Sequence, residues 1–279
     1  MKRLDTKLIR SKIEKIDTLP TIPAVLKKLL KVVEDQRVSL NEISNFISND
    51  PVLATKVLKM VNSPVYGFPG RISSVSQAVI LLGLNVVKGL LLGVSVFELM
   101  QKSMVGLWEH SMACAIIARL IAKKKGLKEP EEISVAGLLH DIGKVILILQ
   151  FHEHYEEAMK QAEYRGILIS EAEKDIFSVT HADAGTWMTQ KWRFPGNLTE
   201  AISCHHRPHQ AKRAPIETAI VHLSDILVRA RGFGFAGDNL VPVMNPSAWE
   251  RLDMTESDLK DILKETEDLL EEAGTAYIE

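Results

Sequence analysis

Apolar residues recur every three to four positions along almost the whole chain, and no segment shows the sustained alternation of a half-buried strand. Start signals for helices are frequent. Capping side chains precede apolar runs at Ser39-Leu-Asn-Glu42, Asp50-Pro51, Ser74-Val-Ser-Gln77, Ser170-Glu-Ala-Glu173 and Thr180-His-Ala-Asp183. A segment rich in Gly, Pro and Ser, residues 62–74, is the clearest early loop. The pattern predicts an all-α, multi-helical protein.

Residues 78–97, AVILLGLNVVKGLLLGVSVF, are long and apolar enough to be read as a membrane span. Lys88 lies near the middle of this segment, however, and Gly83-Leu84-Asn85 interrupts it. We therefore expect two buried core helices, with Gly83 ending the first and Asn85 capping the second. No membrane association is expected.

The character of the chain changes near residue 100, because all nine histidines follow that point. We divide the chain into an N-terminal helical subdomain (1–102), a histidine-bearing helical subdomain (103–231) and a C-terminal part (232–279). The last part begins with a connector rich in Gly and Pro and ends in an acidic amphipathic helix. The buried stripe expected for that helix is Leu259, Ile262, Leu263, Leu269 and Leu270.

The composition is that of an ordinary globular protein, with 46% hydrophobic and 25% charged residues. A net charge of −2 implies no general attraction to nucleic acid. Residues 74–93 have a helix-turn-helix rhythm but offer little beyond Lys88 to read a DNA groove, so DNA binding is not expected. Cys114 and Cys204 provide no disulfide framework and are interpreted as small buried hydrophobic residues. The charged N-terminus lacks the apolar core of a signal peptide, and we expect a cytoplasmic protein.

Several histidines and aspartates fall on the apolar faces of predicted helices. His110 precedes Ala113 and Ile117 by three and seven residues, so it points inward. Asp225 is inward by the same criterion, and the adjacent His140 and Asp141 can both reach one point between helices. Burying such groups costs several kcal/mol unless they are paired or bind a metal. Two His, two Asp and no Cys suit a divalent ion such as iron, manganese, zinc or nickel.

Three later histidines, His181, His205 and His206, could hold a second metal. Two neighbouring metals can clamp the oxygens of a phosphate without a side-chain nucleophile. Lys144 lies four residues after His140 on the same helix face, where it could meet a phosphate oxygen or, as a plain alternative, reach solvent. His222, three residues before Asp225, is either structural or a partner of a metal ligand.

The sequence HDIGK at 140–144, with a preceding helical His and a later Asp, resembles the HD superfamily of metal-dependent phosphohydrolases. The order of the seven ligands is similar to that of the two-metal members, including the HD-GYP branch that hydrolyses cyclic di-GMP. The resemblance implies that His110, His140, Asp141 and Asp225 hold one metal. It further implies that Asp141 bridges to a second metal on His181, His205 and His206, with Lys144 on the substrate.

Four segments resemble the HDOD domain, an HD-related bacterial signalling module: LPTIPAVLKKLLKVVED, ISNDPVLATKVLKMVNSPVYG, ISSVSQAVILLGLNVVKGLLLG and HADAGTWMTQKWRFPGNLTEAISCHHRP. Together they cover roughly residues 15–230. The resemblance implies an all-helical fold and a regulatory role, since HDOD members mostly lack metal ligands and are considered non-catalytic. This chain keeps every ligand position. It lacks a Gly-Tyr-Pro sequence after His206 and carries Gly106 where some HD-GYP proteins place a Glu for a third metal.

Two functions follow from these observations. The first is a signal-transduction protein that binds protein partners and uses its metal site for structure or sensing. The second is a metal-dependent phosphohydrolase acting on a nucleotide or cyclic dinucleotide, with Asp141 and Lys144 in the reaction. Seven ligands exceed the four that a structural ion needs, although metal binding also adds to folding free energy.

Overall fold

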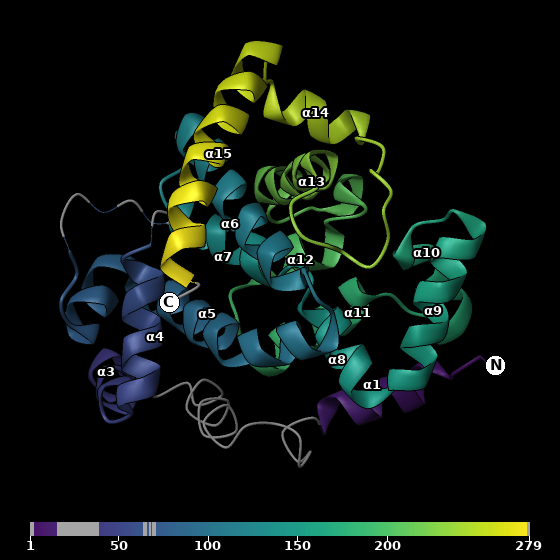
Figure 1. The fold of residues 1–279 in the computed structure, drawn as a ribbon, viewed down its shortest axis with the longest axis horizontal. Coiled ribbons are helices and arrows are strands. Elements are labelled where there is room, and N and C mark those ends of the chain that lie inside the picture. The colour runs from purple at the N-terminus through teal and green to yellow at the C-terminus, as the bar shows by residue number, and fades with distance from the viewer. Residues whose placement is uncertain (1–2, 16–38, 64–65, 67, 69–70, 278–279) are drawn as a thin grey trace.

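The computed structural model describes residues 3–15, 39–63, 66, 68 and 71–277, and every regular element in these ranges is a helix (Figure 1). The elements are α1 (Thr6–Glu14), α3 (Leu40–Ser48), α4 (Pro51–Val61), α5 (Val75–Ser103), α6 (Leu107–Lys124), α7 (Pro130–Leu139), α8 (Ile142–Gln150), α9 (His152–Arg165), α10 (Ile169–Phe177), α11 (His181–Lys191), α12 (Gly196–Cys204), the 3₁₀ turn η2 (Pro208–Gln210), α13 (Pro215–Arg231), α14 (Pro246–Leu252) and α15 (Glu256–Tyr277). The predicted all-α class is confirmed. The first of the four family-like segments, residues 19–35, lies outside the described residues.

The predicted caps are formed at several helix starts. Ser39 and Glu42 make a reciprocal capping box at α3, and Thr180 and Asp183 make another at α11. Asp50 accepts from the backbone of Val52 and Leu53 ahead of Pro51, the first residue of α4. These local patterns suffice to start helices because each satisfies amide groups that the helix itself leaves without partners.

The capping box predicted at Ser170 is wrong. Helix α10 begins two residues earlier than this box requires, at Ile169, and the carboxylate of Glu171 accepts from the backbone N–H of Leu168 at 3.1 Å. Glu173, which the sequence pattern assigns to the cap, is instead completely buried. The shift puts Glu173 on the same inward face as Ile169, Ala172 and Ile176.

Helix α5 breaks where the sequence predicts. Gly83 has φ 78° and ψ 166°, a conformation that only glycine adopts readily, so two helical segments meet at a kink. The expected cap at Asn85 is not seen, and its side-chain amide instead donates to Glu132 at 3.0 Å. Val75–Val94 is long and apolar enough to cross a membrane, but 61% of its most apolar window is buried inside the protein. Gly89 and Gly93 allow this close packing, because a Cβ at either would overlap with Val135 or Leu138 of α7.

The helices that carry the candidate site surround one another in the second half of the chain. Helix α13 packs against α6, α7 and α12, and α11 packs against α8 (Figure 1). The contact between α8 and α11 depends on Gly143, since a Cβ there would overlap with the carbonyl oxygen of His181. This close approach brings the start of α8, where Asp141 lies, against the start of α11, where His181 lies.

The segment between α13 and α14, predicted as a simple connector, folds back over the site. The N–H of Phe235 donates to the carbonyl of Gly106 at 3.0 Å, and the carbonyl of Ala236 accepts from buried Lys144 at 2.8 Å. The carboxylate of Asp238 accepts from the N–H of Ile169 at 2.8 Å. The segment is therefore part of the wall around the site.

The C-terminal helix α15 lies across α6 (Figure 1). Its predicted stripe is confirmed, because Ile262 is buried and Leu259, Leu263, Leu269 and Leu270 pack against the core. The hydrophobic core runs without interruption from Ile9 on α1 to Ile262. The division into subdomains at residues 102 and 231 stays a prediction.

Candidate metal centre

All seven predicted ligands come together between six helices. His110 lies on α6 and Asp225 on α13, whereas His140 ends α7 and Asp141 begins α8. His181 is the first residue of α11, and His205 and His206 directly follow α12. His206 is partly exposed, and the other six side chains are buried.

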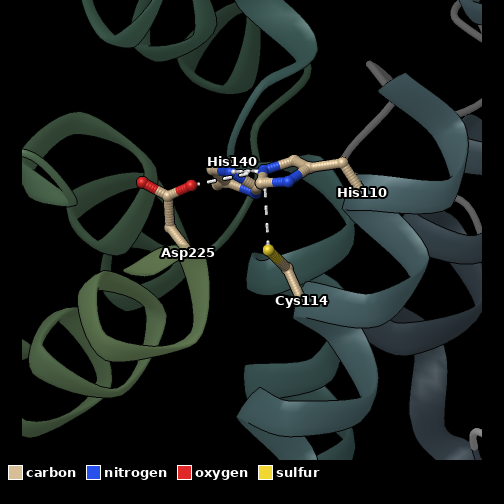
Figure 2. Close-up of side chains that lie close together, drawn as sticks. All are labelled: His110, Cys114, His140 and Asp225. Atoms are coloured by element: carbon tan, nitrogen blue, oxygen red, sulfur yellow. Dashed lines mark hydrogen bonds and ion pairs between the residues drawn. The ribbon is translucent and has the colours of Figure 1, made fainter. Parts of the chain in front are cut away.

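The ligands form two groups. In the first, Nε2 of His110 lies 3.3 Å from Nε2 of His140 and 3.3 Å from Oδ1 of Asp225 (Figure 2). In the second, Nε2 of His181 lies 3.3 Å from Nε2 of His205 and 2.8 Å from Nε2 of His206. Side-chain donor atoms within each group lie within 4.8 Å of one another.

Asp141 connects the two groups. Its Oδ2 lies 3.5 Å from Nε2 of His110 and 3.4 Å from Nε2 of His140, and its Oδ1 lies 3.2 Å from Nε2 of His181. The carboxylate thus presents one oxygen to each group. This is the geometry that a carboxylate bridging two metal ions requires.

The histidine tautomers leave lone pairs that face one another. Nδ1 of His140 donates to the carbonyl of Gly137 at 2.7 Å, and Nδ1 of His205 donates to the carbonyl of Ile202 at 2.6 Å. A carbonyl only accepts, so both Nδ1 atoms carry the proton and both Nε2 atoms are bare in the neutral rings. His181 is held in the same way by Glu173. The bare Nε2 atoms of His181 and His205 therefore face each other at 3.3 Å, an arrangement that a cation would stabilise.

The charges at the site also favour a cation. Burial lowers the pKa of His205 and His206 well below the usual range, and nearby histidines lower it further, so these rings are neutral. Burial alone would raise the pKa of Asp141 and Asp225, but their contacts with His140 and His110 hold both pKa values well below normal. For His140, the effect of burial is outweighed by Asp141, and its pKa is raised. The neutral rings of His205 and His206 and the ionised carboxylates of Asp141 and Asp225 are the forms that bind metals, whereas at His140 a metal must displace a proton that the raised pKa favours.

Three buried polar atoms of the candidate ligands have no hydrogen-bond partner among the described residues: Nδ1 of His110, Oδ1 of Asp141 and Oδ1 of Asp225. Buried polar atoms are almost always satisfied in native proteins. Both carboxylate oxygens face the histidine groups, so a divalent ion in each group would satisfy them. The residues present therefore fit the metal that their pattern predicts.

Lys144 is completely buried, so the alternative in which it reaches solvent is wrong. Its ammonium donates to Oδ2 of Asp141 at 2.5 Å and to the carbonyl of Ala236 at 2.8 Å. An ion pair inside the protein is strong only when its remaining hydrogen bonds are made, as they are here. Lys144 therefore orients Asp141, and its contact with a substrate stays a prediction.

The prediction from sequence missed Glu173. Its carboxylate accepts from Nδ1 of His181 at 2.7 Å, from the N–H of His181 at 2.8 Å and from the hydroxyl of Tyr155 at 2.7 Å. A carboxylate behind a histidine fixes the ring and raises its basicity toward a metal. The available signal was the position of Glu173 on an apolar stripe, four residues after Ile169 and three before Ile176.

Cys114 is buried as predicted, but it lies within the first ligand group. Its Sγ is 3.6 Å from Nε2 of His110 (Figure 2). Burial raises the pKa of this thiol well above normal, and Asp225 and Asp141 raise it further, so the metal-free protein carries a thiol. The signal in the sequence was its spacing of four residues from His110. Cys204 is only partly buried.

His222 contacts the backbone of the predicted ligand His205, and both of its ring nitrogens make hydrogen bonds. Its Nδ1 donates to the backbone carbonyl of His205 at 2.6 Å, and its Nε2 accepts from the N–H of Asn245 at 3.1 Å. Both ring nitrogens are thus engaged with backbone. The interpretation of His222 as a structural residue agrees with these contacts, which also place the chain at His205.

A cavity of about 290 Å³ reaches the second group from outside. It is lined by His206 and His222, by the cations Lys174 and Arg207, by Ser170 and Thr180, and by Leu168, Ala182, Pro242 and Val243. The first group, by contrast, is completely enclosed. A small anionic molecule that enters this cavity meets His206 with positive charge on the surrounding wall.

Comparison with known proteins agrees with this architecture. The sequence matches the HDOD domain family over residues 19–208. An HDOD domain protein of unknown function from Geobacter sulfurreducens has a similar solved structure, with a TM-score of 0.69, 25% identity and 98% coverage of both chains. A presumed phosphohydrolase from Shewanella amazonensis SB2B shares the fold, with a TM-score of 0.65, 20% identity and coverage of 94% of this chain and 98% of that one.

Two curated proteins also match. An uncharacterized protein from Treponema pallidum (strain Nichols) is 28% identical over 80% of this chain and 45% of its own length. Ribonuclease Y from Mycoplasmoides gallisepticum is 29% identical over 47% of this chain and 20% of its own length. The chain thus corresponds to less than half of either relative.

Proposed function

Because the chain belongs to the HDOD domain family, we propose that it is a signal-transduction protein whose interior holds an HD-type divalent-metal centre. The centre holds one or two metal ions. In this proposal the chain acts in the cytoplasm as a regulatory module that binds protein partners. The observation that carries the metal centre is the pair of bare Nε2 atoms of His181 and His205 at 3.3 Å, beside an Asp141 oxygen that has no donor.

In this proposal His110, His140, Asp141 and Asp225 hold one metal, and His181, His205 and His206 hold the second. Asp141 is shared, and Lys144 keeps it oriented through the contact at 2.5 Å. Nitrogen and carboxylate oxygen ligands suit iron or manganese, with zinc or nickel as alternatives. Glu173 supports the second metal through His181.

A second candidate function is a phosphohydrolase, and the cavity at His206 favours it. Two divalent metals supply Lewis acidity toward a phosphate. Arg207 and Lys174 line the cavity, so their charges would attract and orient an anionic substrate. The volume of about 290 Å³ is at the lower end of ligand pockets and suits a phosphate ester or one nucleotide better than a whole cyclic dinucleotide. In this function Asp141 and Lys144, which form an ion pair, are the catalytic residues.

Metal content of the protein tests the centre. The full chain is purified without chelators, both aerobically and anaerobically, and analysed by plasma mass spectrometry. Two equivalents of iron or manganese support the binuclear centre, and one equivalent supports a single structural or sensory ion. Absence of metal under both conditions, and after incubation with each candidate ion, contradicts the proposal.

Hydrolysis assays separate the two functions. The metal-loaded protein is incubated with phosphate monoesters, nucleotides and cyclic dinucleotides, and Arg207→Ala is compared with the exposed-surface change Lys160→Ala. Turnover by the wild type, with a KM raised about tenfold in Arg207→Ala, would support the phosphohydrolase. If the metal-loaded protein shows no turnover, the regulatory role is favoured. Capture of protein partners by the metal-loaded and the metal-free protein then tests that role.

A further inference from the structure

We propose that Cys114 is a ligand of the first metal, so that His110, Cys114, His140 and Asp225 form a four-ligand site of the kind that zinc prefers. This inference rests on the metal centre proposed above and revises its first site, where Cys114 takes the place of Asp141. Oδ2 of Asp141 accepts from Lys144 at 2.5 Å and its Oδ1 faces His181 at 3.2 Å, so this carboxylate is left to the second metal. The prediction of iron or manganese counted no cysteine among the ligands. A thiolate shifts the preference of a site toward zinc and other thiophilic ions.

The helix places the thiol in the site. Cys114 follows His110 by four residues on α6, so both side chains leave the same face of the helix. The Sγ atom lies 3.6 Å from Nε2 of His110, and the ligand atoms of all four residues lie within 4.8 Å of one another. Gly137 of α7 lets α7 approach closely here, since a Cβ on it would lie 2.8 Å from the carbonyl oxygen of Cys114.

Three separations between the donor atoms, those that meet at Nε2 of His110, match the edges of a tetrahedral site. Zinc lies about 2.0–2.1 Å from nitrogen or oxygen and about 2.3 Å from sulfur. Tetrahedral geometry then requires about 3.3 Å between two nitrogen or oxygen ligands and about 3.6 Å between a nitrogen and a sulfur ligand. The distances from Nε2 of His110 are 3.3 Å to His140, 3.3 Å to Asp225 and 3.6 Å to Cys114. The three edges that meet at His110 are therefore already those of a zinc site (Figure 2).

A second observation points to a ligand at this position. Oδ1 of Asp225 is buried and faces Nε2 of His110 at 3.3 Å (Figure 2), but no donor among the described residues makes a hydrogen bond to it. A hydrogen bond between Cys114 and His110 alone would leave this oxygen unsatisfied. A cation between the four side chains satisfies Asp225 and at the same time explains why the thiol points toward it.

The enclosure of this group gives the two metals different roles. Structural zinc sites use four protein ligands, whereas catalytic sites keep one position open. The four side chains around the first ion are all buried, while the cavity reaches the second group at His206. On binding, the sulfur of Cys114 forms a bond to the metal and its proton leaves to solvent, with no change of oxidation state. The first ion is thus structural, and only the second ion can bind molecules that enter from solvent through the cavity.

Cobalt absorption spectroscopy tests the assignment, because the chain has only two cysteines. Metal-free wild type, Cys114→Ala and Cys204→Ala are titrated with Co²⁺. Wild type and Cys204→Ala should show an intense thiolate-to-cobalt charge-transfer band in the near ultraviolet. Cys114→Ala should keep the weaker ligand-field bands of nitrogen and oxygen coordination, lose the intense band, and bind zinc more weakly than wild type at this site.

X-ray absorption of the zinc-loaded wild type keeps the proposal testable if Cys114→Ala fails to fold. A sulfur scatterer at about 2.3 Å from zinc is expected. Bound cobalt without a charge-transfer band, or a zinc shell without sulfur, overturns the role of Cys114 and leaves the metal centre intact. Failure of the wild type to bind cobalt or zinc overturns this inference, and failure to bind iron and manganese as well overturns the proposed function.

Discussion

The carboxylate of Glu173 lies 2.7 Å from Nδ1 of His181, and both side chains are completely buried. The same carboxylate accepts from Tyr155, whose pKa is raised well above normal by burial and by the negative charge of Glu173. Glu173 thus accepts hydrogen bonds from Tyr155 and from both the ring and the backbone N–H of His181. His181 must therefore turn its bare Nε2 toward the second ligand group.

Replacing Glu173 by Gln should weaken metal binding at the second group by about 10–100-fold. The amide keeps the size of the side chain but removes the charge and can point a donor at Nδ1 of His181. Metal affinity measured by competition with a chelator checks this expectation. Glu171→Gln is the matched control, because Glu171 is exposed and its carboxylate caps only Leu168 of α10. Equal affinities of the two variants would argue against support of the metal by Glu173.

Lys144→Met should destabilise the metal-free protein by about 3–5 kcal/mol, because it breaks a buried ion pair and leaves Asp141 without its donor. The carbonyl of Ala236 also loses its partner. Urea unfolding of metal-free wild type and variant measures the effect. Lys174→Met, an exposed change on α10, should leave stability within about 0.5 kcal/mol. A loss below about 1 kcal/mol for Lys144→Met would mean that the pair adds little to stability.

Gly143→Ala should separate α8 from α11, because the added Cβ overlaps with the backbone carbonyl of His181. Overpacking of this kind costs about 1–3 kcal/mol or more. It should also weaken metal binding, since Asp141 and His181 flank the contact and lie 3.2 Å apart. Thermal unfolding and metal affinity are compared with those of Gly185→Ala in the same interface, where the nearest atom would be the Ile202 side chain at 3.1 Å. Similar results for both variants would refute a special role of Gly143.

Glu200 should contribute to stability at neutral pH but not in acid. Burial alone would raise its pKa, but the backbone N–H groups of Ala214 and Arg213, at 2.6 and 2.7 Å, hold the pKa below normal. A carboxyl with a lowered folded pKa stabilises the protein above its unfolded pKa of about 4.3, and the contribution is lost as pH falls through the folded value. Glu200→Gln should therefore unfold at lower urea than wild type at pH 7, and the difference should narrow as the pH falls below about 4.3. A difference that does not narrow in acid would show that geometry, not charge, is responsible.

Local chemistry in the sequence determined the helical class and the helix starts at Ser39, Asp50, Ser74 and Thr180. The caps at Ser39 and Thr180 and the break at Gly83 depend only on neighbouring residues, so they could be predicted. Helical spacing likewise predicted that His110 and Asp225 point inward, because the face of a helix follows from its period. The seven histidines and aspartates were selected by their order in the chain, and all seven lie close together in the structure.

Tertiary packing decided the features that depend on residues far apart in sequence. Glu173 reads as a helix cap by spacing, but the start of α10 at Ile169 turns it into the partner of His181. Lys144 could reach solvent on an isolated helix, yet the segment after α13 covers it and supplies the carbonyl of Ala236. Cys114 is one of several small residues on an apolar helix, and only the approach of α7 and α13 brings His140 and Asp225 to it. Sequence periodicity specifies which face of a helix is buried, whereas the neighbour against that face is set by the packing of the whole bundle.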